Sequence, residues 1–209
     1  MRIGIDIDDT IINTTATIIE HGLEYDRLYK EGRGLKNADA YYFTDIFYWD
    51  DADDEAFFDY YRKNKIFLTV KIKEDAKYYI NKMYDEGIYI EFITYRQSNK
   101  YSDIYEDTKK YLDDNGFKYH KLIVNSGMKG QVCQKENINL FIDDSPTQVE
   151  DCLSYGVPAI LYETNYNQNS PLKKAKTWQE IYEIVKKVKN GKWYLFEKWY
   201  NKKSNKNNI

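Results

Sequence analysis

The hydrophobic positions at the start of the chain alternate with other residues and end in carboxylates. Ile3, Ile5 and Ile7 recur at every second position, which is the spacing of a short buried strand. Asp6 and Asp8 are poor strand residues, so we expect the strand to end beside them. Ligands of an open α/β sheet bind just beyond the carboxyl ends of its strands. These two carboxylates are therefore candidate ligand-binding groups.

From residue 73 onward, hydrophobic runs of strand length alternate with segments of helical spacing. Ala76, Ile80 and Met83, for example, lie three or four positions apart and mark one helix face. Four further strands are predicted, at Ile88–Ile93, Lys121–Val124, Leu140–Ile142 and Pro158–Tyr162. Strands that alternate with helices form a parallel sheet with crossover connections, so the sequence predicts an α/β fold.

The segment between the first two strands has a different pattern. Ile19 and Leu23 lie four apart in a helix predicted to run from Thr14 or Thr15 to about Lys30. Ten aromatic residues follow without strand alternation: Tyr41, Tyr42, Phe43, Phe47, Tyr48, Trp49, Phe57, Phe58, Tyr60 and Tyr61. We expect a discontinuous α/β core formed by residues 1–12 and 73–190, a helical insertion formed by residues 13–72, and a basic tail formed by residues 191–209.

Length and cysteine content fit an intracellular protein. The 209 residues suffice for one large domain, or a domain with an insertion, without disulfide support. Cys133 and Cys152 form neither a disulfide framework nor a metal-ligand spacing, and packing roles are favoured for both. The chain has no apolar run at its start and none long enough to span a bilayer, so a cytoplasmic location without a membrane partner is expected.

Charge is distributed unevenly along the chain. The formal net charge is −3, yet residues 186–209 hold eight Lys and one Glu. A basic tail can indicate nucleic-acid binding. This tail has no Arg and is rich in Asn, which favours a solvated helix end over a nucleic-acid partner.

Polar side chains follow three of the predicted strands, and a lysine lies between the third and fourth strands. In chain order the candidates are Asp6, Asp8, Thr94, Lys129, Asp143 and Asp144. Clustered carboxylates repel one another unless a cation joins them. Mg²⁺ prefers oxygen ligands and is commonly bound by one or two carboxylates together with phosphate and water. The set therefore points to a magnesium site that handles phosphate.

Each member of this set also has a simpler reading. Thr94 alone is an ordinary hydroxyl at a strand end. Lys129 could be a surface lysine, with Lys121 and Lys135 as nearby competitors for a functional role. The acidic pair could serve only as a turn before a helix. The combination and its order along the chain carry the argument.

That order, Asp-x-Asp, then Thr, then Lys, then an acidic pair, resembles the four-part pattern of the haloacid dehalogenase (HAD) superfamily from Arg2 to about Trp178. Three stretches are similar to the deoxyribonucleotidase and 5′-nucleotidase type C group and its bacterial relatives: Ile-Gly-Ile-Asp-Ile-Asp-Asp-Thr, Phe-Ile-Thr-Tyr-Arg and Leu-Phe-Ile-Asp-Asp-Ser-Pro. The resemblance implies a three-layer Rossmann-like fold in which residues 13–72 form the small helical cap.

The resemblance also implies roles for the residues. Asp6 would be the nucleophile that forms an aspartyl-phosphate, and Asp8 the general acid and base. Thr94 and Lys129 would bind the phosphate, and Arg96 could meet phosphate or another part of the substrate.

The metal ligands implied by the resemblance come from the first and fourth motifs. Asp6, Asp8 through its backbone carbonyl, and Asp144 would ligate Mg²⁺. Asp143 would bind through water or orient Asp144.

With these roles, the protein is expected to be a Mg²⁺-dependent phosphomonoesterase whose small-molecule substrates are (deoxy)nucleoside monophosphates. The alternatives are a phosphatase for sugar phosphates or other metabolites, and a non-catalytic phosphate-binding protein. Aromatic residues of the cap could stack on a base or simply form its core. The oligomeric state stays open, a homodimer included.

Overall fold

The computed structural model describes residues 1–190, and the predicted basic tail lies outside them. A six-stranded parallel sheet has the order β3-β2-β1-β4-β5-β6. Its strands are β1 (Arg2–Ile5), β2 (Tyr89–Ile93), β3 (Lys121–Ile123), β4 (Leu140–Asp143), β5 (Ala159–Tyr162) and β6 (Lys174–Ala175). The helices are α1 (Thr14–Tyr29), α2 (Asp51–Lys63), α3 (Ala76–Asp85), α4 (Ile104–Asp114), α5 (Gly130–Lys135), α6 (Pro146–Ser154) and α7 (Trp178–Lys189).

The predicted α/β fold and its parallel sheet are confirmed. All five predicted strands are present with small differences at their ends. The sixth strand, β6, was not predicted, because two residues cannot show a hydrophobic period. Three short 3-10 helices complete the structure: η1 (Phe43–Asp45), η2 (Ile66–Leu68) and η3 (Asn165–Asn167).

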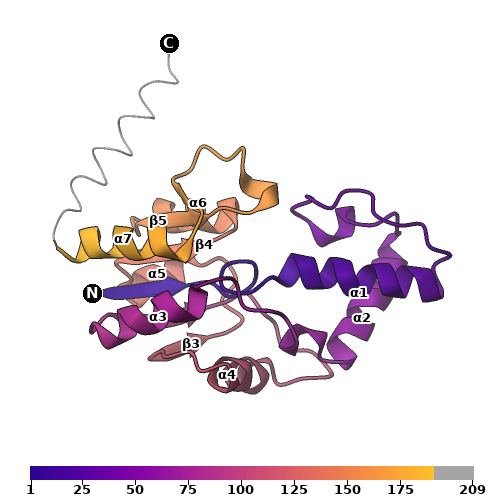
Figure 1. Cartoon of the computed structure of the whole chain (residues 1–209), viewed down its shortest axis with the longest axis horizontal. Helices are drawn as coiled ribbons and strands as arrows, with labels where there is room; N and C mark the ends of the chain where they lie inside the picture. The colour runs from indigo at the N-terminus through magenta and orange to yellow at the C-terminus, as the bar shows by residue number, and fades with distance from the viewer. Residues whose placement is uncertain (191–209) are drawn as a thin grey trace, which may run out of the picture.

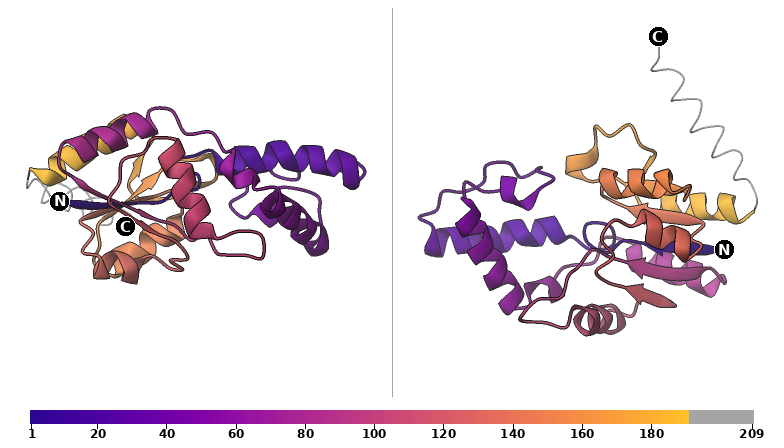
Figure 2. Two further views of the ribbon diagram at one scale, coloured as in Figure 1. Left: turned by 90° about the horizontal axis from the view of Figure 1, so that it is seen from below. Right: turned by 180° about the vertical axis from the view of Figure 1, so that it is seen from behind.

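Successive side chains of the central strands point to opposite faces of the sheet, so the sheet has a hydrophobic core on each face and forms the middle of three layers. Ile3 and Ile5 belong to the core that contains α3, α4 and α7, whereas Phe141 belongs to the core beneath α5 and α6. Gly4 faces this second core, where a Cβ atom would approach Phe141 Cδ2 to 2.8 Å. The sheet is therefore covered by helices on both faces, as the views in Figure 2 show.

Residues 13–72 carry a hydrophobic core separate from those of the sheet. Its buried members include Ile46, Phe47 and Phe57. The chain leaves and re-enters the sheet at one place, where Ile12 and Ile72 form an antiparallel bridge. Figure 1 shows α1 and α2 extending from one end of the sheet. We propose that this segment, with the boundaries predicted from the sequence, forms a cap over the sheet edge.

Stacked rings and one buried carboxylate organise this cap. The rings of Phe47 and Trp49 are stacked with centroids 4.0 Å apart, and Phe57 packs against Trp49. The carboxylate of Asp26 accepts hydrogen bonds from Trp49 Nε1 at 2.7 Å and from the backbone of Gly34 at 2.8 Å. The aromatic run thus folds back onto α1.

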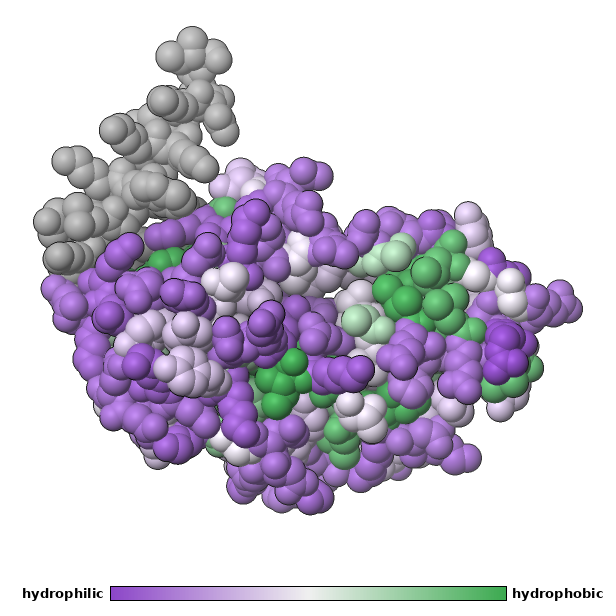
Figure 3. All heavy atoms as spheres, in the orientation of Figure 1, coloured by the Kyte–Doolittle hydropathy of each residue, from purple (hydrophilic) through white to green (hydrophobic). Residues whose placement is uncertain are grey.

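The face of the molecule in Figure 3 is mostly hydrophilic, with hydrophobic side chains gathered over the region of α1. Within residues 1–190, none of the helices combines the length and the apolar character that crossing a bilayer requires.

The close approach of α1 to Phe47 gives a stability prediction. A Cβ atom on Gly22 would come within 3.2 Å of three atoms of the Phe47 ring. Alanine favours helix formation by about 0.5–1 kcal/mol over glycine, but overpacking a filled core costs about 1–3 kcal/mol. Since Phe47 is fully buried and stacked on Trp49, we expect Gly22→Ala to lower the free energy of unfolding by about 1–2 kcal/mol.

Urea or thermal denaturation measures this change. Glu20→Ala, on an exposed position of the same helix, is the matched control and should leave stability within about 0.5 kcal/mol of the wild type. A Gly22→Ala variant at least as stable as the wild type would show that Phe47 can move aside.

Candidate active site

The carboxyl ends of the central strands open into a pocket of about 470 Å³ beneath the cap. Asp6 directly follows β1, Thr94 follows β2, and Asp143 ends β4. Six of the residues predicted from the sequence line this pocket: Asp6, Asp8, Thr94, Lys129, Asp143 and Asp144. Parallel strands bring these distant positions together because their carboxyl ends share one sheet edge.

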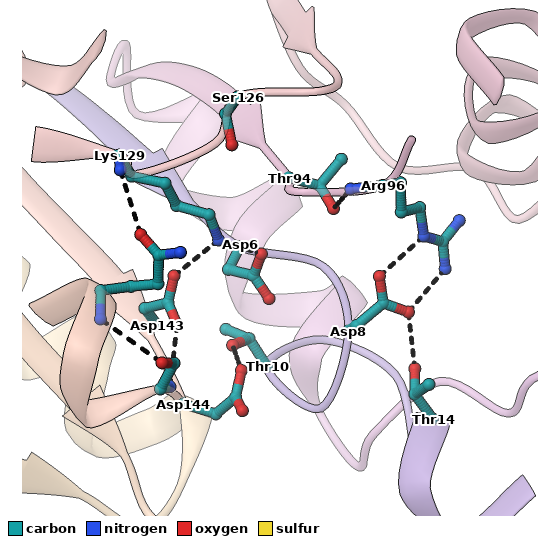
Figure 4. Close-up of polar contacts among 12 residues, drawn as sticks. Asp6, Asp8, Thr10, Thr14, Thr94, Arg96, Ser126, Lys129, Asp143 and Asp144 are labelled. Atoms are coloured by element: carbon teal, nitrogen blue, oxygen red, sulfur yellow. Dashed lines mark hydrogen bonds and ion pairs between the residues drawn. The ribbon is translucent and has the colours of Figure 1, made fainter. Parts of the chain in front are cut away.

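Lys129 joins two of the carboxylates. Its Nζ forms ion pairs with Asp6 and with Asp143, the latter at 2.7 Å, and the residue is only 2% exposed. The lysine directly precedes α5, and its backbone N–H donates to the side chain of Gln148 at 3.0 Å. Lys129 is therefore a fixed part of the pocket floor and not a surface lysine (Figure 4).

Asp144 is held by neutral groups. Thr10 Oγ1 donates to its carboxylate at 2.8 Å, and the hydroxyl of Tyr166 donates to the second oxygen. Asn167 donates to its backbone carbonyl at 2.8 Å. Thr10 belongs to the first sequence motif, but its hydrogen bond to Asp144 was not predicted. Sequence reasoning missed Tyr166 and Asn167, which lie in η3 after β5 and carry no recognisable signal.

The charges of the pocket do not balance within the protein. Carboxylate oxygens of Asp6, Asp143 and Asp144 lie within 4.8 Å of one another, and all three residues are buried. One ammonium group, that of Lys129, contacts two of them. Burial and the neighbouring carboxylates raise the pKa of all three, that of Asp144 to about 8. An all-oxygen, net negative donor set fits a hard divalent cation such as Mg²⁺.

Asp8 is held differently. Burial opposes its ionisation, but the guanidinium of Arg96 and the hydroxyl of Thr14 bring its pKa below the ordinary value. Arg96 Nε and Nη2 donate to the two carboxylate oxygens at 2.7 and 2.8 Å, and Thr14 Oγ1 donates at 2.7 Å. Figure 4 shows Asp8 turned toward these two partners. Arg96, predicted to meet phosphate or substrate, orients Asp8; it does not line the pocket that holds Asp6 and Lys129 but lines a neighbouring one.

Asp9 has a local structural role. Its backbone adopts a left-handed conformation with φ of 53°, in which aspartate is tolerated more readily than most residues. Its carboxylate accepts a hydrogen bond from the backbone N–H of Thr15 at 3.0 Å, in the first turn of α1. This bond ties the loop after β1 to the first turn of α1 and so fixes the position of Asp8, the neighbour of Asp9.

A second pocket of about 580 Å³ lies on the other side of Asp8. Asp8, Phe43 and Tyr95 line both pockets. The remaining wall of the second pocket comes from the cap and from the loop after β2 and is largely aromatic and polar: Thr14, Ile18, Phe58, Tyr61, Arg62, Phe67, Arg96, Gln97, Ser98, Asn99 and Ile104. Some cap aromatics therefore line a pocket while others, such as Phe57, form the core.

Polar contacts tie the cap to the sheet edge on both sides of these pockets. On one side, Tyr41 shares a hydrogen bond of 2.6 Å with Ser145, and its ring meets the edge of Tyr166. On the other, Lys100 forms an ion pair of 2.7 Å with Asp59 of α2. The cap is thus seated over the carboxylates in this structure.

Comparison with known proteins decides the family. Residues 1–191 match the sequence profile of the family described as 5′ nucleotidase, deoxy (pyrimidine), cytosolic type C protein. The chain belongs to this nucleotidase family. The resemblance carried by the sequence motifs is confirmed, since the match covers both the α/β core and the inserted helices.

Two curated relatives are similar to this nucleotidase-family chain. "Putative 5'(3')-deoxyribonucleotidase" of Chlorobaculum tepidum is 25% identical over 128 residues, which is 59% of this chain and 60% of the relative. "Putative nucleotidase" of Bacillus cereus is 31% identical over 86 residues, 39% of this chain and 46% of the relative. The matched part thus spans about three-fifths and about half of these relatives.

Solved structures support the HAD fold of the family member. A HAD-superfamily hydrolase, subfamily IA, variant 1 from Geobacter sulfurreducens superimposes with a TM-score of 0.60 at 13% identity, covering 88% of this chain and 95% of that one. At this identity the likeness establishes the fold, and the site must be argued from the residues of this nucleotidase-family chain itself.

The unbalanced carboxylates predict an unusual dependence of stability on pH. Asp144 has a pKa of about 8 in the folded protein and 3.8 ordinarily, so between these values the folded state binds more protons than the unfolded state. Its contribution to stability therefore falls as pH rises through this window. In chelator, we expect the free energy of unfolding to drop by about 1–3 kcal/mol between pH 6 and pH 8.

Mg²⁺ should reverse this loss. Because it binds the ionised form, it should raise the melting temperature more at pH 8 than at pH 6. Asp144→Asn should flatten the pH dependence and remove most of the Mg²⁺ shift, and Asp143→Asn should affect the shift less because Lys129 already balances Asp143. Identical melting curves with chelator and with Mg²⁺ would exclude a cation site here.

Proposed function

We propose that this protein is a Mg²⁺-dependent phosphomonoesterase that acts through an aspartyl-phosphate, with (deoxy)nucleoside monophosphates as substrates. One observation carries the proposal. Asp6, paired with Lys129 and close to two further carboxylates, lies in one pocket, and Asp8 forms the border to a second, aromatic-lined pocket. A phosphate and its leaving group fit such a divided site.

Asp6, Asp143 and Asp144 would hold the cation, with the backbone carbonyl of Asp8 as the ligand implied by the family. When bound, Mg²⁺ neutralises charge on the phosphate, so that an anionic nucleophile can approach an anionic substrate. The carboxylate of Asp6 then attacks phosphorus, the bond to the ester oxygen breaks, and the phosphoryl group resides on Asp6. Water cleaves this acyl phosphate in the second step.

The neighbouring side chains stabilise the charge that moves in these steps. Lys129 contacts Asp6 and stays positively charged, because its two carboxylate partners raise its pKa against the effect of burial. Its ammonium group stabilises both the nucleophile and the phosphoryl oxygens. Thr94, in the same pocket, offers its hydroxyl to a phosphoryl oxygen.

Asp8 would move the proton. It lies between the pockets, where the ester oxygen of a substrate would lie. It would protonate the leaving oxygen in the first step and accept a proton from water in the second. The bidentate contact with Arg96 favours the ionised form of Asp8, which suits the second step. In the first step, Asp8 must bring a proton while its orientation is kept by Arg96 and Thr14.

The aromatic pocket supports a nucleotide over a plain sugar phosphate. Phe43, Phe58 and Phe67 line this pocket, and stacking a base on an aromatic side chain contributes about 1–3 kcal/mol. A sugar phosphate would use the first pocket in the same way but would not stack on these rings. A cytoplasmic location is also proposed, which the free, buried thiols of Cys133 and Cys152 fit.

A panel of phosphomonoesters tests the function. With Mg²⁺, we expect nucleoside monophosphates to be hydrolysed with a higher kcat/KM than sugar phosphates, and chelator to stop turnover. Asp6→Asn should abolish hydrolysis because the nucleophile is lost, and Asp8→Asn should lower kcat by about 10²–10⁴-fold. Asp85→Asn, on the exposed surface of α3, is the control and should retain full activity. Preferred turnover of sugar phosphates would favour the alternative substrate class, and no turnover of any ester would favour a binding protein.

The stereochemistry at phosphorus tests the covalent step separately. Two in-line displacements, first by Asp6 and then by water, retain the configuration at phosphorus of an isotopically chiral phosphorothioate ester hydrolysed in isotopically labelled water, whereas direct attack by water inverts it. We expect retention in transfer from the chiral ester to product. Inversion would refute Asp6 as nucleophile and leave it a metal ligand, whatever the activities of the variants.

A further inference from the structure

Tyr61 of α2 lines the second pocket and carries a buried polar atom, its hydroxyl. The residue lines this pocket and is 6% exposed, and its hydroxyl has no hydrogen-bond partner in the part of the chain that the structure describes. Leaving a buried hydroxyl unpaired is unfavourable, and native proteins satisfy the large majority of such groups. An unpaired hydroxyl in a pocket wall suggests that a ligand supplies the partner.

The position of Tyr61 is fixed by the cap. The centroid of its ring lies 6.1 Å from that of Phe57, 6.3 Å from that of Phe58 and 6.4 Å from that of Phe67. Burial raises the pKa of Tyr61, and among nearby charges Asp8 raises it further while Arg96 lowers it. The phenol therefore stays protonated at neutral pH and lies within electrostatic reach of the Asp8–Arg96 pair.

Tyr61 belongs to the buried part of the pocket lining. Phe67 and Ile104 are buried as well, whereas Gln97 and Ser98 are exposed. Asp8, at the border with the phosphate pocket, marks the position of the ester oxygen. In a nucleotide, the group attached to that oxygen is the sugar, and the base lies farther along the pocket.

We propose that Tyr61 is a specificity-determining residue whose hydroxyl forms a hydrogen bond with an oxygen of the sugar of a nucleotide substrate. A phenol can both donate and accept, so either a sugar hydroxyl or the ring oxygen satisfies it. The inference rests on the nucleotidase function proposed above. It explains why a polar atom is kept among the phenylalanine rings of this wall.

Tyr61→Phe tests the inference with two substrates, a deoxynucleoside 5′-monophosphate and p-nitrophenyl phosphate, which has no sugar. The loss of one hydrogen bond should lower kcat/KM for the nucleotide by about 3- to 10-fold and leave that for p-nitrophenyl phosphate within about twofold. The melting temperature should not fall, since the folded protein loses no hydrogen bond. Tyr60→Phe, one position away on the same helix and outside the pocket lining, should match the wild type on both substrates.

The other outcomes separate the inference from the function on which it rests. If the wild type hydrolyses the nucleotide and Tyr61→Phe is equally active on both substrates, the inference is overturned and the nucleotidase function stands. Equal losses on both substrates with a lower melting temperature would make the hydroxyl structural, which also overturns the inference. Wild-type protein that hydrolyses only p-nitrophenyl phosphate would refute the proposed function and this inference with it.

Discussion

Charge imbalance at one sheet edge is the constraint on which the site depends. Asp6, Asp143 and Asp144 are buried within a few ångströms of one another, and Lys129 contacts only two of them. The fold creates this arrangement because adjacent parallel strands end at the same edge. The hydrophobic cores on both faces of the sheet bury the strands that hold these carboxylates in place, at an electrostatic cost that a bound cation would remove.

A second ion pair separates the two halves of the site. Arg96 binds Asp8 through Nε and Nη2 and lines the aromatic pocket. Lys129 and Thr94 line the other pocket. The two basic residues are thus divided, with Lys129 paired to Asp6 and Asp143 and Arg96 paired to Asp8.

The inserted segment supplies most of the aromatic lining of the second pocket. Its aromatic residues divide by position, since Phe47, Trp49 and Phe57 pack against one another while Phe43, Phe58 and Tyr61 reach a pocket. The packed rings give the insertion a core, and the remaining rings can then be held rigidly against a ligand. Contacts such as Tyr41 with Ser145 and Lys100 with Asp59 hold the cap over the sheet edge.

The sequence by itself determined the parallel α/β fold, because strand and helix periods differ and their alternation permits few topologies. It also pointed to the pocket carboxylates and Thr94, because polar residues at the carboxyl ends of parallel strands meet at one edge. Lys129, which directly precedes α5, was identified through the family resemblance. Only the tertiary structure decided which cap aromatics line a pocket, that Arg96 binds Asp8, and that Tyr166 and Thr10 hold Asp144. Those pairings join residues between 22 and 134 positions apart through side-chain directions that no local period records. The short strand β6 was missed for the same reason, since its two residues are defined by their neighbour β5 and not by their own pattern.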